Sequence, residues 1–156
     1  MKLTHLLFLL LAFSCTNYTG NTSLFNKDLK QLNYGTTFGM CIGLCQTLYE
    51  ITDDQIRLIK SAWEWQDVPS LTCISDLSES DFMAISRTLS ISEFKKLPNT
   101  FGCPDCADGG AEFIELVFLD GRKQRVTFEY MNEPNQLKEI VELLRQTTAD
   151  FKECSN

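Results

Sequence analysis

The sequence predicts an α+β domain in which helices pack on one face of an antiparallel or mixed sheet of about five strands. Three observations lead to this prediction. Apolar residues alternate with a period of two in several short segments, as in strands with one buried face. An Asp120-Gly121 turn joins two of these segments, and an amphipathic helical stretch closes the chain. The expected element order is β-β-β-α-β-β-α, which is typical of the α+β class.

Three strands are expected in the first half of the domain. Residues 37–49 alternate, and one parity is apolar at Phe38, Met40, Ile42, Leu44 and Leu48. The Thr52-Asp53-Asp54 turn leads into residues 55–65, a second strand rich in isoleucine and tryptophan. Pro69 ends that strand, and residues 70–75 form a short third one.

One helix is expected next. Ser78 and Asp81 have the spacing of a capping box, with Ser78 at the N-cap. The side chains that then share one helical face are Phe82, Ile85 and Leu89. Ser92 is expected to cap a further turn that ends before Pro98, and residues 101–110 form a loop that carries two cysteines.

The register of the hairpin over residues 111–130 follows from parity. Even-numbered residues are apolar on both arms, at Ile114, Leu116, Phe118, Val126, Phe128 and Tyr130. A two-residue Asp120-Gly121 loop would place even residues opposite odd ones and so put the two apolar sets on different faces. A three-residue loop over residues 119–121 pairs Phe118 with Arg122 and keeps both sets on one face. We therefore predict the three-residue loop, with Gly121 left-handed.

A closing helix is expected after Glu133-Pro134-Asn135. Its apolar face consists of Leu137, Ile140, Val141, Leu144 and Phe151, and its polar face of Lys138, Glu139, Glu142 and Arg145.

The N-terminus is typical of an export signal. Lys2 is followed by an apolar run from Leu6 to Phe13, which is too short to cross a bilayer as a permanent helix. The Ala12-Phe-Ser-Cys15 junction resembles a relaxed bacterial lipoprotein cleavage box. In that resemblance residues 1–14 are the signal peptide, and Cys15 receives diacylglycerol and an acyl chain such as palmitate. The alternative is an ordinary secretory signal that leaves Cys15 unmodified.

These features give the predicted organisation and location. Residues 15–33 are expected to be a polar tether, and residues 34–156 a single α+β domain. The expected contact with the membrane is the lipidated Cys15. Thr16, rather than aspartate, follows that cysteine, which by analogy with lipoprotein sorting favours the outer membrane.

Composition excludes several function classes. The formal net charge is −7 and no basic cluster occurs, so nucleic-acid binding is not expected. The only histidine, His5, lies in the predicted signal. The mature chain would then lack the base for Ser-His-Asp or Cys-His catalysis and any histidine ligand for a metal. We predict a non-enzymatic protein without catalytic residues, metal or cofactor.

Six further cysteines are predicted to form disulfides, as is usual in an exported chain. They are Cys41, Cys45, Cys73, Cys103, Cys106 and Cys154. In a regular strand Cys41 and Cys45 would have Cα atoms about 13 Å apart, beyond the reach of a disulfide. These two cysteines are therefore expected to bond elsewhere, to Cys73 or to the loop of Cys103 and Cys106.

Two other chemistries remain open for the cysteines. Cys103-Pro-Asp-Cys106 has the spacing of a thiol-disulfide redox pair, although no helix follows it and Asp105 and Asp108 disfavour a thiolate. Alternatively, the two cysteine pairs form a zinc site. A calcium site at Asp105, Asp108 and Glu112 is a weaker alternative, because their spacing does not follow a twelve-residue loop.

Aromatic and acidic residues allow further interpretations. Trp63 and Trp65 are expected on one face of the second strand, as packing residues or as a stacking surface for a sugar or peptide. Glu112, Glu115 and Glu129 are interpreted as surface charges rather than an acid/base pair.

The segment Cys41-Ile-Gly43-Leu-Cys45-Gln-Thr-Leu-Tyr49 resembles the C-x-G-x-C-x-x-Y opening of a bacterial lipoprotein domain family of unknown function. The similarity of plan covers about residues 34–150. The sequence departs from the family at Gln46, where proline is frequent, and by adding Cys73 and the Gly102–Gly110 loop. The resemblance implies a fold and no activity.

The sequence thus predicts a lipid-anchored, disulfide-stabilised envelope domain. Its expected role is to bind a protein or glycan partner, or to serve the envelope structurally.

Overall fold

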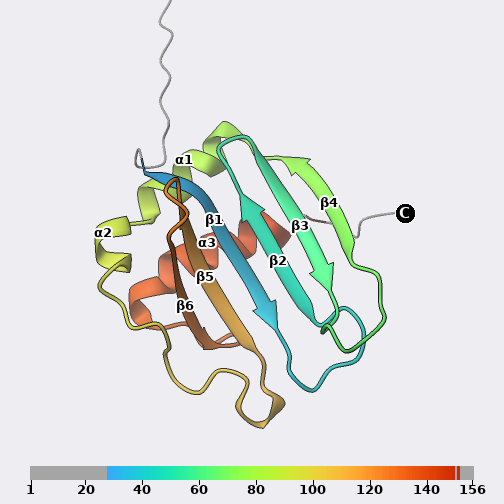
Figure 1. The fold of residues 1–156 in the computed structure, drawn as a ribbon. Helices are drawn as coiled ribbons and strands as arrows, with labels where there is room; N and C mark the ends of the chain where they lie inside the picture. The colour runs from blue at the N-terminus through green and yellow to red at the C-terminus, as the bar shows by residue number, and fades with distance from the viewer. Residues whose placement is uncertain (1–27, 150, 152–156) are drawn as a thin grey trace, which may run out of the picture.

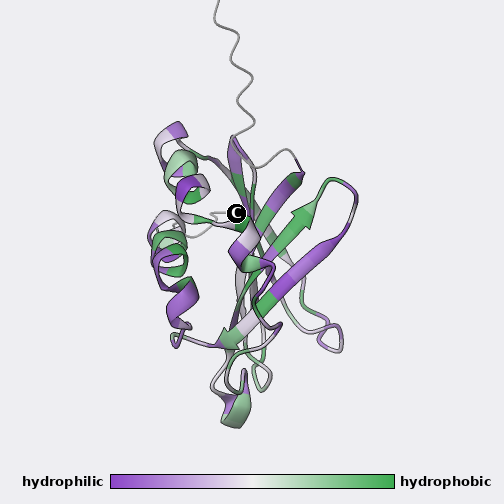
Figure 2. Ribbon diagram, turned by 90° about the vertical axis from the view of Figure 1, so that its left-hand side faces the viewer, coloured by the Kyte–Doolittle hydropathy of each residue, from purple (hydrophilic) through white to green (hydrophobic). Residues whose placement is uncertain are grey.

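The computed structural model describes residues 28–149 and 151, which form an open six-stranded antiparallel sheet with helices on one face (Figures 1 and 2). The elements are β1 (Leu29–Thr37), β2 (Gln46–Ile51), β3 (Gln55–Ser61), β4 (Leu71–Asp76), α1 (Glu79–Thr88), α2 (Ile91–Phe94), η1 (Cys106–Asp108), β5 (Ala111–Phe118), β6 (Lys123–Glu129), η2 (Asn135–Leu137) and α3 (Lys138–Ala149). The strand order in the sheet is β4-β3-β2-β1-β5-β6. The predicted α+β class is confirmed, whereas the predictions of about five strands and of their order are wrong.

The core lies between the helices and the face of the sheet that they cover. The sheet contributes the buried side chains of Leu32, Ile51, Ile56, Ile114, Leu116, Val126 and Phe128, and the helices contribute Phe82, Ile85, Ile140, Val141 and Leu144. Burial of each such side chain stabilises the fold by about 1.5–3 kcal/mol. Among the described residues, no helix is long and apolar enough to cross a membrane.

The start of the sheet differs from the prediction. The alternating segment 37–49 is not one strand: β1 ends at Thr37, a loop covers residues 38–45, and β2 begins at Gln46. The alternation in 38–45 does not reflect a buried face, because Met40 and Ile42 are both exposed. Residues 29–33, predicted to belong to the polar tether, lie instead in β1, which pairs with both β2 and β5.

The hairpin prediction is confirmed in register and loop length. The N–H of Phe118 donates to the carbonyl of Arg122 at 2.9 Å, and the N–H of Gly121 donates to the carbonyl of Phe118 at 3.0 Å. Gly121 has a φ of +85°, the left-handed conformation that glycine adopts without strain. Ile114 therefore lies opposite Val126, and the even-numbered apolar side chains of both β5 and β6 point to the core face of the sheet.

The helix signals are also largely confirmed. Ser78 is the N-cap of α1, and its hydroxyl accepts a hydrogen bond from the N–H of Asp81 at 3.1 Å. The cap of α2 is Ser90 rather than the predicted Ser92. After α3, the ring of Phe151 packs edge-on against Tyr49 with centroids 5.8 Å apart, as its place on the predicted apolar face implies.

We expect Gly35→Ala to destabilise the protein by about 1–3 kcal/mol, because β1 has no room for a side chain there. A Cβ at Gly35 would collide with the carbonyl oxygen of Thr47 and come within 2.8 Å of the Phe113 ring. Urea unfolding followed by circular dichroism measures the loss. Gly109→Ala, where the nearest atom would be the Cys106 carbonyl oxygen at 3.2 Å, should cost less. Equal losses in the two variants would contradict this explanation.

Candidate functional site

Four connecting segments meet at one end of the sheet, which we call the loop end (Figure 1). They are residues 38–45, 62–70, 101–110 and 130–134, which lie between β1 and β2, between β3 and β4, before β5 and after β6. In an antiparallel sheet these connections must emerge on the same side. β1 begins at the opposite end of the sheet.

The first of these segments is closed by a Cys41–Cys45 disulfide with Cα atoms 5.7 Å apart. The expectation that these cysteines could not pair is therefore wrong, because it assumed a regular strand. The chain instead turns back at Gly43, whose φ is +96°, and the N–H of Cys45 donates to the Gly43 carbonyl at 2.9 Å. The C-x-G-x-C spacing thus forms a compact loop.

Cys103 and Cys106 also bond to each other, with Cα atoms 5.5 Å apart. The general prediction of disulfides is confirmed, but each pair is local and none joins the two loops. Cys73 on β4 is disulfide-bonded as well. Cys15 and Cys154, the other cysteines singled out in the sequence, lie outside the described residues.

Side-chain hydrogen bonds join segment 38–45 to segment 62–70. The amide of Gln66 accepts from the Gly43 N–H at 2.7 Å and donates to the Cys41 carbonyl at 2.8 Å. The indole N–H of Trp63 donates to the Phe38 carbonyl at 2.9 Å. The two segments therefore form one unit.

Segment 101–110 is attached to its neighbours in the same way. The Asp105 carboxylate accepts the Gly39 N–H at 3.1 Å, and the Glu129 carboxylate accepts the Cys103 N–H at 2.9 Å. The Cys103 hydrogen bond, together with that of Asn132, lowers the pKa of Glu129. Glu129 thus keeps its predicted charge, and it uses that charge to hold a disulfide loop in place.

The loop end exposes a set of large apolar side chains: Met40, Ile42, Leu44, Trp65, Val68, Tyr130 and Met131. Ile42 is 89% exposed, Met40 82% and Trp65 73%. The segments that carry them are in contact, through Gln66 and through the edge-on packing of Phe38 on Tyr130 at 5.0 Å. Trp63 and Trp65 do not share a strand face, because β3 ends at Ser61. Large exposed apolar patches often mark interaction sites on proteins, which makes the loop end the candidate site of this chain.

The charges of the loop end are all negative. Its four segments contain no lysine or arginine, and they carry Glu64, Asp67, Asp105, Asp108 and Glu133. The four segments thus supply carboxylates and no cation of their own, and Arg145 of α3 pairs with one of these carboxylates, Glu133. Such a surface matches a partner with basic residues around an apolar centre and repels anionic surfaces.

A buried ion pair lies directly beneath this surface. Glu112 on β5 is fully buried, and Arg145 on α3 donates to it from Nε at 3.0 Å and from Nη2 at 2.6 Å. The Tyr34 hydroxyl also donates to Glu112. Burial, and then the adjacent carboxylate, raises the pKa of that hydroxyl, so it stays protonated and can donate. The hydrogen bonds to Glu112 likewise raise the pKa of Arg145.

The interpretation of Glu112 and Glu115 as surface charges is therefore wrong. Glu115 is also buried, and it accepts hydrogen bonds from Asn33 at 2.9 Å and from Arg125 at 3.0 Å. The burial of Glu112 could have been predicted, because Glu112 has an even number, like the residues of β5 that face the core.

The Glu112–Arg145 pair supports the loop end. The second oxygen of Glu112 accepts the N–H of Met131 at 3.2 Å, and Arg145 bonds the Glu133 carboxylate at 2.8 Å. Segment 130–134 is thus held from below. A shallow pocket of about 300 Å³ opens beside this network, between β1–β3 and the last turn of α3.

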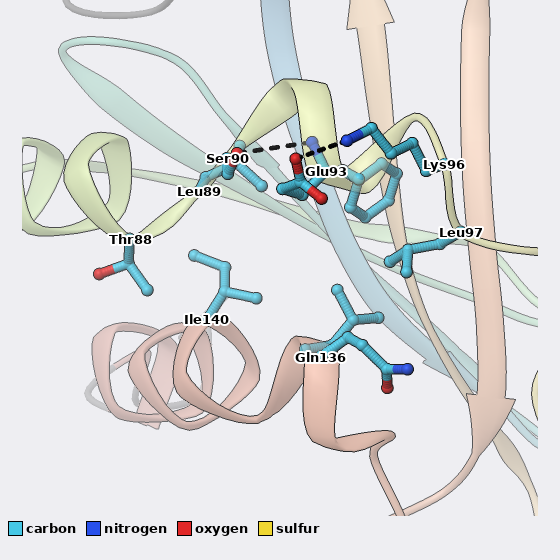
Figure 3. A pocket seen from close by; sticks show the side chains of 10 residues that line it. Thr88, Leu89, Ser90, Glu93, Lys96, Leu97, Gln136 and Ile140 are labelled. Carbon is cyan, nitrogen blue, oxygen red and sulfur yellow. Dashed lines mark hydrogen bonds and ion pairs between the residues drawn. The ribbon is translucent and has the colours of Figure 1, made fainter.

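A second pocket lies in the helical layer, away from the loop end (Figure 3). Its volume is about 160 Å³, and Leu89, Leu97 and Ile140 point into it from α1, α2 and α3 and their connections. An exposed Glu93–Lys96 ion pair at 2.7 Å lies on its rim. No pattern in the sequence indicated this pocket.

The structure does not bring together the residues of the alternative zinc and calcium sites. Within the described residues, no group of three or more histidine, cysteine, aspartate or glutamate side chains could hold an ion. The Glu112 oxygens are occupied by other partners, because they accept hydrogen bonds from Arg145 and Tyr34. The sulfurs proposed for zinc are bonded to one another in pairs.

We expect Arg145→Met to cost about 3–5 kcal/mol, because it leaves the buried Glu112 charge without a cation. Arg87→Met is the matched control, since Arg87 is exposed on α1, and it should change stability by less than about 0.5 kcal/mol. Adding Glu112→Gln to Arg145→Met should recover part of the loss in urea unfolding. If the double variant loses as much stability as Arg145→Met alone, the loss comes from the packing of the arginine side chain and not from the unpaired charge of Glu112.

Comparison with known proteins leaves the chain unassigned: it matches no protein-family model, and no curated protein is similar to it. The resemblance to a lipoprotein domain family stays a prediction.

Proposed function

We propose that this protein is a lipid-anchored domain of the cell envelope, held in the outer membrane through Cys15, that binds a protein partner with its loop end. The observation that carries the proposal is the exposure of Ile42, Met40 and Trp65 on loops that disulfides and hydrogen bonds hold together. Side chains on such loops lose little conformational freedom when a partner binds, which favours affinity.

The charge of the loop end supports a protein rather than a lipid or nucleic-acid partner. Its carboxylates repel phosphate groups, so neither an anionic membrane nor a nucleic acid is attracted to it. A glycan is a less favoured partner. It could stack on the exposed Trp65, but it would offer Met40 and Ile42 no apolar groups to contact.

Thiol-disulfide exchange at Cys103 and Cys106 is the second candidate, and the exposure of both residues favours it. Their surroundings favour a stable bridge instead. η1 has only three residues and supplies no helix dipole to Cys103, and the neighbouring Asp105 opposes formation of a thiolate. A redox enzyme would equilibrate this disulfide with a dithiol buffer near the potentials of known oxidoreductases, whereas a structural bridge would remain oxidised there.

The anchor is tested by replacing its attachment site. We expect the wild-type chain, produced in a bacterium, to incorporate labelled palmitate and to sediment with membranes. Cys15→Ser should abolish the label. Equal labelling of both proteins, or full recovery of the unlabelled wild type from the soluble periplasm, would remove the anchor from the proposal.

The loop end is tested with a pair of exposed apolar residues at opposite ends of the sheet. A photoreactive amino acid at position 42 should give a discrete adduct with one envelope protein in intact cells, and the same amino acid at Leu119 should not. Leu119 is a fair control because it is 66% exposed in the β5–β6 turn.

The partner identified in this way is then purified and its affinity measured. Ile42→Lys should weaken binding by roughly tenfold or more, because it replaces the most exposed apolar side chain of the loop end. Leu119→Lys should leave the affinity unchanged, and added salt should weaken binding, since the loop end is acidic. Equal effects of the two lysine variants would refute the proposed surface.

A further inference from the structure

We propose that two copies of this chain pair through the outer edge of β4, forming an antiparallel ribbon that joins two six-stranded sheets across a two-fold axis. This inference concerns a different part of the molecule from the loop end and does not depend on the anchor.

The two edges of the sheet differ. At the β6 edge, the N–H of Thr127 donates to the Asn99 carbonyl and the N–H of Phe101 donates to the Thr127 carbonyl, both at 2.9 Å. The segment before residue 101 thus covers part of that edge. β4 ends the sheet on the other side, and no strand of the described chain pairs with its outer edge.

The direction of each peptide group in β4 follows from the register. The N–H of Leu77 donates to the Asp54 carbonyl at 2.9 Å, one step beyond the pairing of Gln55 with Asp76. In an antiparallel pair every second residue bonds to the same neighbour. Residues 71, 73 and 75 therefore bond to β3, and the N–H and C=O groups of Thr72, Ile74 and Asp76 point away from the sheet. Among the described residues, only one side chain bonds to these outward groups: the Ser75 hydroxyl donates to the Asp76 carbonyl at 3.4 Å.

The side chains of β4 do not protect this edge. Protein edge strands usually avoid pairing by means of lysine, proline or a bulge. β4 has no lysine or proline, its pairing with β3 is regular, and its central Ile74 is 64% exposed. An edge with which no strand of the described residues pairs is suited to receive another strand.

A second copy of β4 fits the edge best. A two-fold axis at Ile74 places it opposite the partner's Ile74, with Thr72 opposite the partner's Asp76. All twelve outward N–H and C=O groups on the two copies of these three residues then find partners, and the two isoleucines form a cross-strand apolar contact. An axis at Cys73 instead would pair Thr72 with the partner's Ile74 and leave Asp76 beyond the ribbon.

The charge pattern allows the first arrangement. Asp76 is the one charged residue of β4. With the axis at Ile74, Asp76 and the partner's Asp76 lie four residues apart along the ribbon, about 13 Å. Each aspartate faces a threonine, which can donate a hydrogen bond to it, so like charges are not opposed.

The first test uses the full chain in membranes. Two copies with different affinity tags are produced together, each with a photoreactive amino acid in place of Ile74. Irradiation should yield a product that contains both tags and has twice the mass of the chain. The same photoreactive amino acid at position 42 should yield no such doubly tagged product. A product of position 74 with another protein, or no product, would overturn the proposal.

The second test measures the equilibrium. Wild-type protein extracted in detergent should sediment with two copies per particle, and Ile74→Lys should raise the dimer dissociation constant roughly tenfold or more by opposing two ammonium groups. Thr72→Pro removes an outward N–H without touching the bonds to β3, so it should weaken the dimer too. Ile42→Lys should leave it intact. Thermal unfolding verifies that each variant is folded. A wild-type protein that sediments as a monomer, or edge variants that remain fully dimeric, would refute the pairing.

Discussion

The buried Glu112–Arg145 ion pair joins the sheet, the closing helix and the loop end, and the support of the loop end depends on it. Glu112 is fully buried, so its charge requires the guanidinium that α3 brings across the core face of the sheet. The same carboxylate holds the backbone at Met131, and the same guanidinium holds Glu133. These contacts hold the backbone of segment 130–134 in place, so its apolar side chains remain exposed at the loop end.

Local sequence signals predicted the second half of the chain well. The hairpin register was determined by parity alone, because only a three-residue loop places the apolar sets of β5 and β6 on one face. α3 was equally evident from its apolar stripe. The first strand was missed because a register shift between Leu29 and Gln31 interrupts the period of two in β1, while the loop that follows happens to alternate.

The candidate site was predictable in its chemistry but not in its geometry. Six cysteines in a chain predicted to be exported indicate disulfides, yet their pairing depends on the path of the backbone. One left-handed glycine, Gly43, brings Cys41 and Cys45 together where an extended chain would have kept them apart. Nor could the sequence show that connections from four distant segments meet at one end, since this depends on the strand order.

The central position of β1 affects how the chain folds. Leu32 lies opposite Leu116, 84 residues later, so β1 keeps one side unpaired until nearly the whole domain has been made. Closing so long a segment costs chain entropy before the contact can offset it, and folding is correspondingly slow. Until β5 is made, one edge of β1 has no partner strand, and the incomplete sheet can pair with other chains there. Protection by a chaperone while the chain is being completed is therefore of most value to the first strand of this protein.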